Sequence, residues 1–279
     1  MDGRCYSRVE LRRAPHGGKF RTRAKIHITN NRTCMLSINN EWDQLRSVVV
    51  GIADYANWPS DDTIFSKEHQ KTTWTETPVP SGPVPQRIID ETNEDLHLLC
   101  EVLVKHGVEV TRPETMNFQK LGGMYNYCPR DRLLIVGDII IDPAMMYPCR
   151  DMEYRCYLEV LIQSRQILNM PRNQGLVLDA ANVCHIGPKK LLYLESPSGN
   201  RQAYHWLLAN LSPDISIELC NFYSGVHIDS TVVPLREGLV LLNGSRVNDE
   251  NCPLGFKDWE KIYVQDVVAQ DFYQYPYAS

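Results

Sequence analysis

The amino-acid sequence predicts an α/β fold built from about four repeats of one mixed unit, in the order strand, strand, helix, strand. Three observations support this prediction. Short apolar runs typical of strands recur along the chain, other segments have helical spacing, and hairpin signals separate some neighbouring runs. This order differs from the simple alternation of a doubly wound sheet. It favours a closed ring of units around a central channel, with site residues at strand ends near the axis.

The first unit begins with a strand within Trp42–Asp54, which ends at Gly51. Apolar residues recur at helical spacing over Gln86–His106, so we expect a helix there, with Gly107 as its stop. A short strand is expected at Val108–Thr111.

A hairpin signal, Gly137-Asp138, separates the apolar runs Leu133–Val136 and Ile139–Ile141. The remaining predicted elements are helices at Asp151–Leu168 and Asn200–Leu211, strands at Gly175–Leu178, Ala181–Ile186, Leu191–Leu194, Ile215–Leu219, Ser230–Pro234 and Gly238–Leu242, and a short helix and strand within Asp258–Val268. In the first of these helices, Glu153 and Arg155 are expected on a solvated face.

Composition excludes several classes of protein. The chain has 279 residues, 43% of them hydrophobic and 23% charged, which is ordinary for a globular protein. Its net charge of −5 does not favour nucleic acid as a partner, and no apolar run approaches the length of a membrane span. The nine cysteines are odd in number and include no CxxC pair, which favours reduced thiols in the cytoplasm over disulfides or a metal site. We expect no cofactor.

The charge is unevenly distributed. Residues 1–34 hold nine Lys and Arg residues against two acidic ones. Three interpretations are open: a flexible basic tail, an organelle-targeting segment, or upstream sequence ahead of a natural start at Met35. We favour a disordered or non-native extension, followed by one domain over residues 35–279.

The stretch Tyr223–Thr231 carries the first candidate site. His227 and Asp229 alternate with apolar residues, which predicts a strand with both side chains on one face. Arg246 follows in a turn after an apolar strand. An acid/base, an anion and a fixed cation suit a zwitterionic substrate that bears a guanidinium. The alternative is a buried histidine with satisfied hydrogen bonds beside a turn aspartate.

Two further acids occupy comparable places. Asp131 precedes one apolar strand and Asp179 ends another. A single aspartate at a strand end is equally explained as a turn or cap residue. Three such acids on separate units are more informative, because a ring would gather them around His227. Two carboxylates can grip a planar guanidinium, and a third can orient the imidazole.

Five short segments occur in the order found in the amidinotransferases, and the chain resembles that family from about Asn39 to its C-terminus. They are Asn40-Glu-Trp-Asp43, Pro129-Arg-Asp131, Met152-Glu-Tyr-Arg155, Leu178-Asp-Ala-Ala181 and Val226-His-Ile-Asp229. The resemblance implies the pentein fold, an α/β propeller of ββαβ-type modules around a pseudo-fivefold axis. About four modules are expected here, with the last one incomplete or missing.

The resemblance also implies roles for individual residues. The family's site carries over to the catalytic residues Asp179 and His227 and to the substrate-binding residues Asp131, Asp229, Arg246 and Ser279. In this scheme His227 is the acid/base and Asp179 supports it. Arg246 binds the donor's carboxylate, and Ser279 is what remains of the family's Ser-Ser pair.

The implied reaction is ping-pong. A cysteine thiolate attacks the guanidinium carbon of L-arginine, ornithine leaves, and an amine acceptor takes the amidino group. The implied partners are therefore small molecules. Family members are often dimers, so a homodimer is open for this chain.

The sequence departs from the family at the nucleophile, which lies there in a Gly-Gly-Gly-x-His-Cys stretch near the C-terminus. None of the nine cysteines, Cys252 included, has this context. We therefore expect a truncated chain without turnover. An arginine deiminase-like hydrolase and a non-catalytic arginine-binding remnant stay open as alternatives. The acceptor is open among glycine, an inosamine and a biosynthetic amine.

Overall fold

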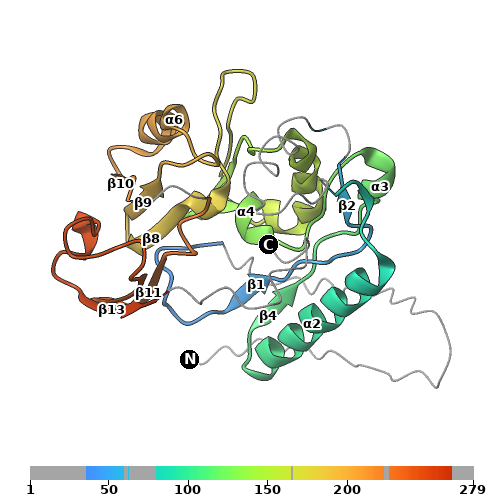
Figure 1. Ribbon diagram of the computed structural model, residues 1–279, viewed down its shortest axis with the longest axis horizontal. Helices are drawn as coiled ribbons and strands as arrows, with labels where there is room; N and C mark the ends of the chain where they lie inside the picture. The colour runs from blue at the N-terminus through green and yellow to red at the C-terminus, as the bar shows by residue number, and fades with distance from the viewer. Residues whose placement is uncertain (1–35, 60–61, 63–79, 165, 223–225, 266–279) are drawn as a thin grey trace. The chain divides into compact units, whose positions relative to one another are not determined.

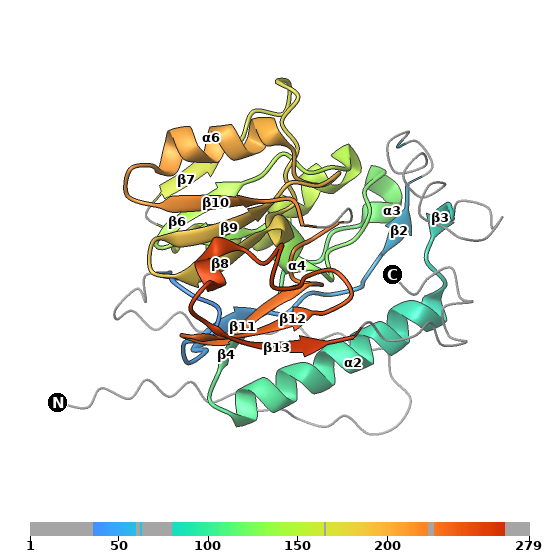
Figure 2. The same cartoon turned by 60° about the vertical axis from the view of Figure 1, so that its left-hand side comes forward.

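The computed structural model describes residues 36–59, 62, 80–164, 166–222 and 226–265 (Figures 1 and 2). All of them lie in the compact unit Cys34–Ser279. The predicted N-terminal extension and Ser279 lie outside the described residues. Among those described, the helices are too short or too polar to cross a membrane.

Three sheets share one topology. In each, the first two strands form an antiparallel hairpin and the third strand pairs in parallel with the second. The sheets are β5 (Leu134–Val136), β6 (Ile139–Asp142) and β7 (Gln166–Asn169); β8 (Val183–Gly187), β9 (Lys190–Leu194) and β10 (Ser216–Cys220); and β11 (Val232–Arg236), β12 (Leu239–Asn243) and β13 (Glu260–Val264).

A helical crossover joins the second and third strands of each sheet, because parallel neighbours cannot be joined by a tight turn. The crossovers are the 3-10 helix η1 (Pro148–Tyr157) with α5 (Leu158–Leu161), then α6 (Arg201–Leu211), then the 3-10 helix η3 (Leu254–Phe256). The repeated strand–strand–helix–strand unit predicted from the sequence is thus confirmed.

A fourth, partial unit precedes these three. Strand β1 (Ser47–Val49) pairs in parallel with β4 (Glu109–Thr111) across the helix α2 (Gln86–Lys105). The shorter elements are β2 (Asn57–Trp58), β3 (Gly82–Pro83), α3 (Phe118–Leu121), α4 (Pro129–Arg132) and the 3-10 helix η2 (Ala180–Asn182).

Each crossover packs against the preceding unit as well as its own sheet. Helix α6 buries Leu207 in a cluster with β5, β6 and β9, and Figure 2 shows this helix along β7 and β10. In the same way η1 and α5 share a cluster with β6 and with Val49 of β1, and η3 joins β8, β9, β11 and β12 in another. Consecutive units are therefore held together by shared apolar cores.

The predicted helix Asp151–Leu168 is wrong. The segment is a 3-10 helix, one turn of α-helix and then strand β7, which pairs with β6. A 3-10 helix has three residues per turn, and its buried Arg150, Glu153 and Cys156 follow that spacing. Two of the residues on the buried face are charged, so the spacing of apolar residues alone does not reveal the three-residue period.

Most other predicted elements are confirmed within two or three residues. Helix α2 ends just before Gly107, whose φ of 81° suits only glycine without strain. The predicted strand Gly175–Leu178 is wrong, because only Leu178 forms a bridge, with Gly199. The backbone there turns to place Asp179 rather than to extend a sheet.

The shared cores predict a contrast between two leucines. Leu207 is 0% exposed between two units, and Leu98 on α2 is 52% exposed. We expect Leu207→Ala to lower the free energy of unfolding by about 2–5 kcal/mol. The matched Leu98→Ala change is expected to cost less than about 1 kcal/mol. Urea denaturation of both variants measures this, and equal losses would contradict the packing described.

Candidate active site

The site is formed where three loops from different units meet. Asp131 lies on α4, Asp179 directly precedes η2 and β8, and His227 and Asp229 lie between β10 and β11. Figures 1 and 2 both show α4 next to the start of β8. The sequence prediction that these side chains converge is therefore met by the geometry.

The sequence predicted a strand that carries His227 and Asp229 on one face. This prediction is wrong, because His227 lies between β10 and β11. Its φ is 61°, in the left-handed region, and Thr231 donates a backbone hydrogen bond to the Ile228 carbonyl at 2.9 Å. Ile228 is fully buried and its N–H donates to the carbonyl of Ala181 at 2.9 Å. A tight turn anchored by this isoleucine aims the imidazole into the site.

The His227 ring lies between two carboxylates. Its Nε2 is 3.3 Å from Asp179 Oδ2, and its Nδ1 is 3.7 Å from Asp131 Oδ1. Burial lowers the pKa of His227, but the hydrogen bond to Asp179 and the charges of Asp131 and Asp179 outweigh burial, so its pKa is raised. Asp179 is itself fixed, because its Oδ1 accepts the Met146 N–H at 2.9 Å.

A buried ion-pair network supports Asp131. Arg150 donates from Nη1 to Asp131 Oδ2 at 2.9 Å, and from Nε and Nη2 to Glu153 at 2.9 and 3.0 Å. The Arg150 guanidinium also lies over the Tyr125 ring, 4.8 Å from its centroid. Burial raises the pKa of Glu153, and the Arg150 charge opposes that shift.

Glu153 was expected on a solvated face, and this was wrong because it is 0% exposed. Arg155 is exposed, as expected. Arg150 was missed altogether. The three-residue spacing of Arg150, Glu153 and Cys156 after Pro148 is the pattern that could have identified both charged residues.

Asp229 is the most open member of the cluster, with 43% of its side chain exposed. Its Oδ2 is 4.0 Å from Arg130 Nε. Burial raises the pKa of Asp229, against the lowering effect of Arg130. Its accessible carboxylate can therefore receive a cation from outside.

Arg246 lies beside this cluster rather than in it. Its Nη1 donates to Ser230 Oγ at 3.1 Å and to Thr231 Oγ1 at 3.0 Å, so it contacts the loop that carries His227 and Asp229. Within the described residues, no group of three or more His, Cys, Asp or Glu side chains is arranged to hold a metal ion.

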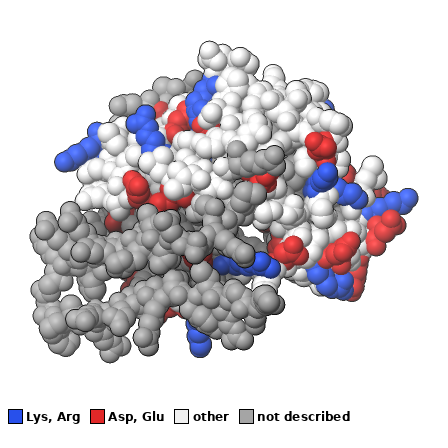
Figure 3. All heavy atoms as spheres, turned by 180° about the vertical axis from the view of Figure 1, so that it is seen from behind, with Lys and Arg blue, Asp and Glu red and all other residues white. Residues whose placement is uncertain are grey.

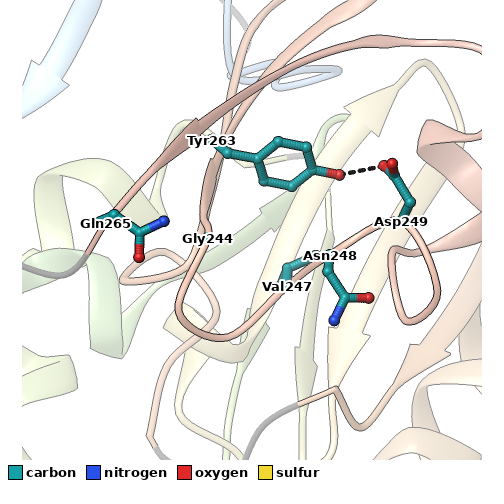
Figure 4. A pocket seen from close by; sticks show the side chains of 6 residues that line it. All are labelled: Gly244, Val247, Asn248, Asp249, Tyr263 and Gln265. Carbon is teal, nitrogen blue, oxygen red and sulfur yellow. Dashed lines mark hydrogen bonds between the residues drawn. The ribbon is translucent and has the colours of Figure 1, made fainter.

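A small pocket of about 180 Å³ opens next to the Arg246 turn (Figure 4). Its walls are Gly244, Val247, Asn248, Asp249, Tyr263 and Gln265. The Tyr263 hydroxyl donates a hydrogen bond to Asp249 Oδ1 at 2.6 Å, so this carboxylate oxygen already has a partner within the protein. None of the converging residues lines this pocket, so it is separate from the cluster of acids.

Six of the seven described cysteines are poor nucleophiles. All seven are free, and burial raises the pKa of six of them: Cys128, Cys149, Cys156, Cys184, Cys220 and Cys252. For Cys128, just before α4, the pKa reaches about 12 because the Asp131 charge adds to burial. A reactive thiol needs a lowered pKa.

Comparison with known proteins places the chain. Inosamine-phosphate amidinotransferase 1 of Streptomyces glaucescens is 36% identical over 271 residues, which cover 85% of this chain and 78% of that protein. L-arginine:L-lysine amidinotransferase of Pseudomonas savastanoi pv. phaseolicola is 27% identical, with 83% of this chain and 74% of that protein covered. No family model matches the sequence.

Comparison with solved structures supports the same family and the same fold. The inosamine-phosphate amidinotransferase of Streptomyces griseus matches with a TM-score of 0.76 and 35% identity, covering 85% of this chain and 77% of that one. DDAH from Pseudomonas aeruginosa matches with a TM-score of 0.58 at 13% identity, covering 80% of this chain and 77% of that one, which shows the fold alone. The fold is the pentein α/β propeller expected from the sequence. The chain belongs to the amidinotransferase family.

Proposed function

We propose that this amidinotransferase takes the amidino group of L-arginine and passes it to an amine acceptor. The observation that carries the proposal is the gathering of Asp131, Asp179 and Asp229 around His227, whose pKa is raised by these acidic neighbours. Acids that converge on an open site suit a planar cation, because each can accept two charge-assisted hydrogen bonds from a guanidinium.

His227 is the proposed acid/base and Asp179 the residue that supports it. In the family's ping-pong scheme a cysteine thiolate, a role not assigned here to any described residue, would bond to the guanidinium carbon, and the carbon–nitrogen bond to ornithine would break. The proton that ornithine needs would come from the His227 imidazolium, and the neutral imidazole left behind would later accept a proton from the acceptor amine. Asp179 favours the protonated ring through its 3.3 Å contact.

Arg246 is the proposed contact for the donor's carboxylate, and Ser279 is a further proposed substrate contact. The position of Arg246 supports this role, since its guanidinium is tied to the Ser230–Thr231 turn beside Asp229. A guanidinium held in this way forms a fixed partner for a carboxylate.

The acceptor is proposed to be an aminocyclitol phosphate. Relatives named for inosamine phosphate are 36–37% identical to the chain, whereas the L-arginine:L-lysine enzyme is 27% identical and the Xenopus tropicalis glycine enzyme 26%. The alternative of an arginine deiminase-like hydrolase is less well supported. DDAH is only 13% identical to the chain, so this similarity supports a common fold and says nothing of the site. On the face in Figure 3, acidic and basic side chains of the described residues are interspersed, which suits small-molecule partners better than nucleic acid. The homodimer and the cytoplasmic location stay predictions.

L-Arginine binding tests the proposal. We expect the 279-residue chain to bind L-arginine in isothermal titration, and Asp229→Asn to raise the Kd about tenfold through loss of a charge-assisted hydrogen bond. Asp214→Asn, on an exposed turn, is the control. Burial raises the pKa of six described cysteines, so none of these six is expected to act as the thiolate in transfer to an inosamine phosphate. Absence of heat at millimolar L-arginine would contradict the proposed function.

The pairing of His227 with Asp179 predicts a pH dependence. Since the folded pKa of His227 lies above its ordinary value of 6.5, the pair stabilises the fold fully below pH 6.5 and less as pH rises through the folded pKa. Asp179→Asn should lower the His227 pKa measured by NMR and remove that part of the pH dependence in urea unfolding. An unchanged His227 titration would show that Asp179 does not support the ring, whereas Asp214→Asn should leave it unchanged.

A further inference from the structure

The site proposed to bind a guanidinium already contains guanidinium groups of the protein itself. Arg150 contacts Asp131, and Arg130 approaches Asp229. An arginine side chain free to turn toward these acids would compete with the substrate for the same oxygens. The structure must therefore restrict how far each arginine engages its acid.

Arg150 is restricted by Glu153. A guanidinium has five N–H groups in a fixed fork, and Glu153 takes the edge formed by Nε and Nη2. This contact fixes the orientation of the guanidinium, and in that orientation Arg150 meets Asp131 through Nη1 at one oxygen, Oδ2. The other oxygen, Oδ1, lies on the side of His227, 3.7 Å from its Nδ1.

We propose that Glu153 is a positioning residue for substrate recognition, which fixes Arg150 in the orientation that makes a single hydrogen bond to Asp131 and so keeps Asp131 Oδ1 available to the substrate's guanidinium. This inference rests on the proposed function. Charge supports it, because Arg150 carries one positive charge for the two carboxylates of Glu153 and Asp131, so the three groups together keep a net negative charge when both acids are ionised.

A similar restraint acts on the second arginine. Arg130 donates from Nη2 to the Val183 carbonyl at 2.7 Å and from Nη1 to the Ala180 carbonyl at 3.3 Å, and Nη2 lies 3.6 Å from Glu41. Its Nε therefore stays 4.0 Å from Asp229. Although burial opposes it, hydrogen bonding to His185 and the Arg130 charge lower the pKa of Glu41 to about 2. Asp131 and Asp229 thus each lie next to an arginine whose contacts with other groups limit how closely it approaches the acid.

The alternative is that Arg150 and Glu153 only stabilise η1. A stabilising pair and a restraint differ in what happens when both residues are removed. If Glu153 restrains Arg150, loss of Glu153 alone should weaken L-arginine binding. Loss of Arg150 as well should then recover it, because the competing guanidinium is gone.

The test measures the L-arginine Kd by calorimetry and the His227 titration by NMR, on the 279-residue chain. For Glu153→Gln we expect the Kd to rise about tenfold or more. We also expect the His227 pKa to fall, as Arg150 turns to Asp131 and offsets its charge. The matched control is Asp142→Asn, which breaks the neighbouring buried pair with Arg132. This control should leave the Kd within about twofold at equal folded fraction.

The double variant Arg150→Met/Glu153→Met replaces the pair with apolar side chains and keeps the test valid should Glu153→Gln fail to fold. If Glu153→Gln folds, the double variant should bind L-arginine more tightly than Glu153→Gln does. If Glu153→Gln does not fold, the Kd of the double variant should lie within about threefold of that of the unaltered chain. A double variant that has lost binding entirely would overturn the inference. If the unaltered chain binds no L-arginine, the proposed function fails instead, and an unchanged His227 pKa in Glu153→Gln would overturn the restraint separately.

Discussion

The cost of burying several carboxylates close together governs this site. Asp131, Asp179 and Glu153 are all buried within one cluster, and such groups stay charged only when cations or N–H donors compensate them. The fold supplies Arg150 for two of them. The third, Asp179, interacts with the backbone N–H of Met146 and with the His227 ring. Arg150 and the Met146 N–H come from the connection between β6 and β7, and His227 comes from the one between β10 and β11, so these contacts tie the segments together.

The repeated unit explains how those segments meet. Each crossover packs into the core of the preceding unit, which brings the loops beside successive sheets to a common place. Apolar packing sets the positions of the loops, and the polar network then sets the directions of the side chains. The turn at Ile228 shows both effects, since a buried isoleucine and one backbone hydrogen bond orient the neighbouring imidazole.

Sequence patterns were sufficient where apolar period and turn chemistry agreed. Helix α2, its stop at Gly107 and the hairpin around Gly137 were predictable for that reason, and Gly137 has the positive φ that its turn requires. Prediction failed where tertiary contacts override local pattern. The alternation around His227 resembles a strand, yet Ile228 is buried by a turn and not by a pleat.

Charged residues of the buried network were the other failure. Arg150 and Glu153 were not recognised because charge is normally found on the surface, and their burial depends on pairing that no single sequence displays. The candidate acids were indicated first by their places at strand ends and then by an ordered set of short motifs, which is more specific than any one motif. Their roles, unlike their positions, are still predictions.

A crystal structure of the chain with L-arginine bound tests the central claim most directly. We expect the substrate guanidinium between Asp131 Oδ1 and the Asp229 carboxylate, next to His227, with Arg150 still paired to Glu153. A guanidinium bound elsewhere, or an Arg150 that has left Glu153 to bind both oxygens of Asp131, would contradict it.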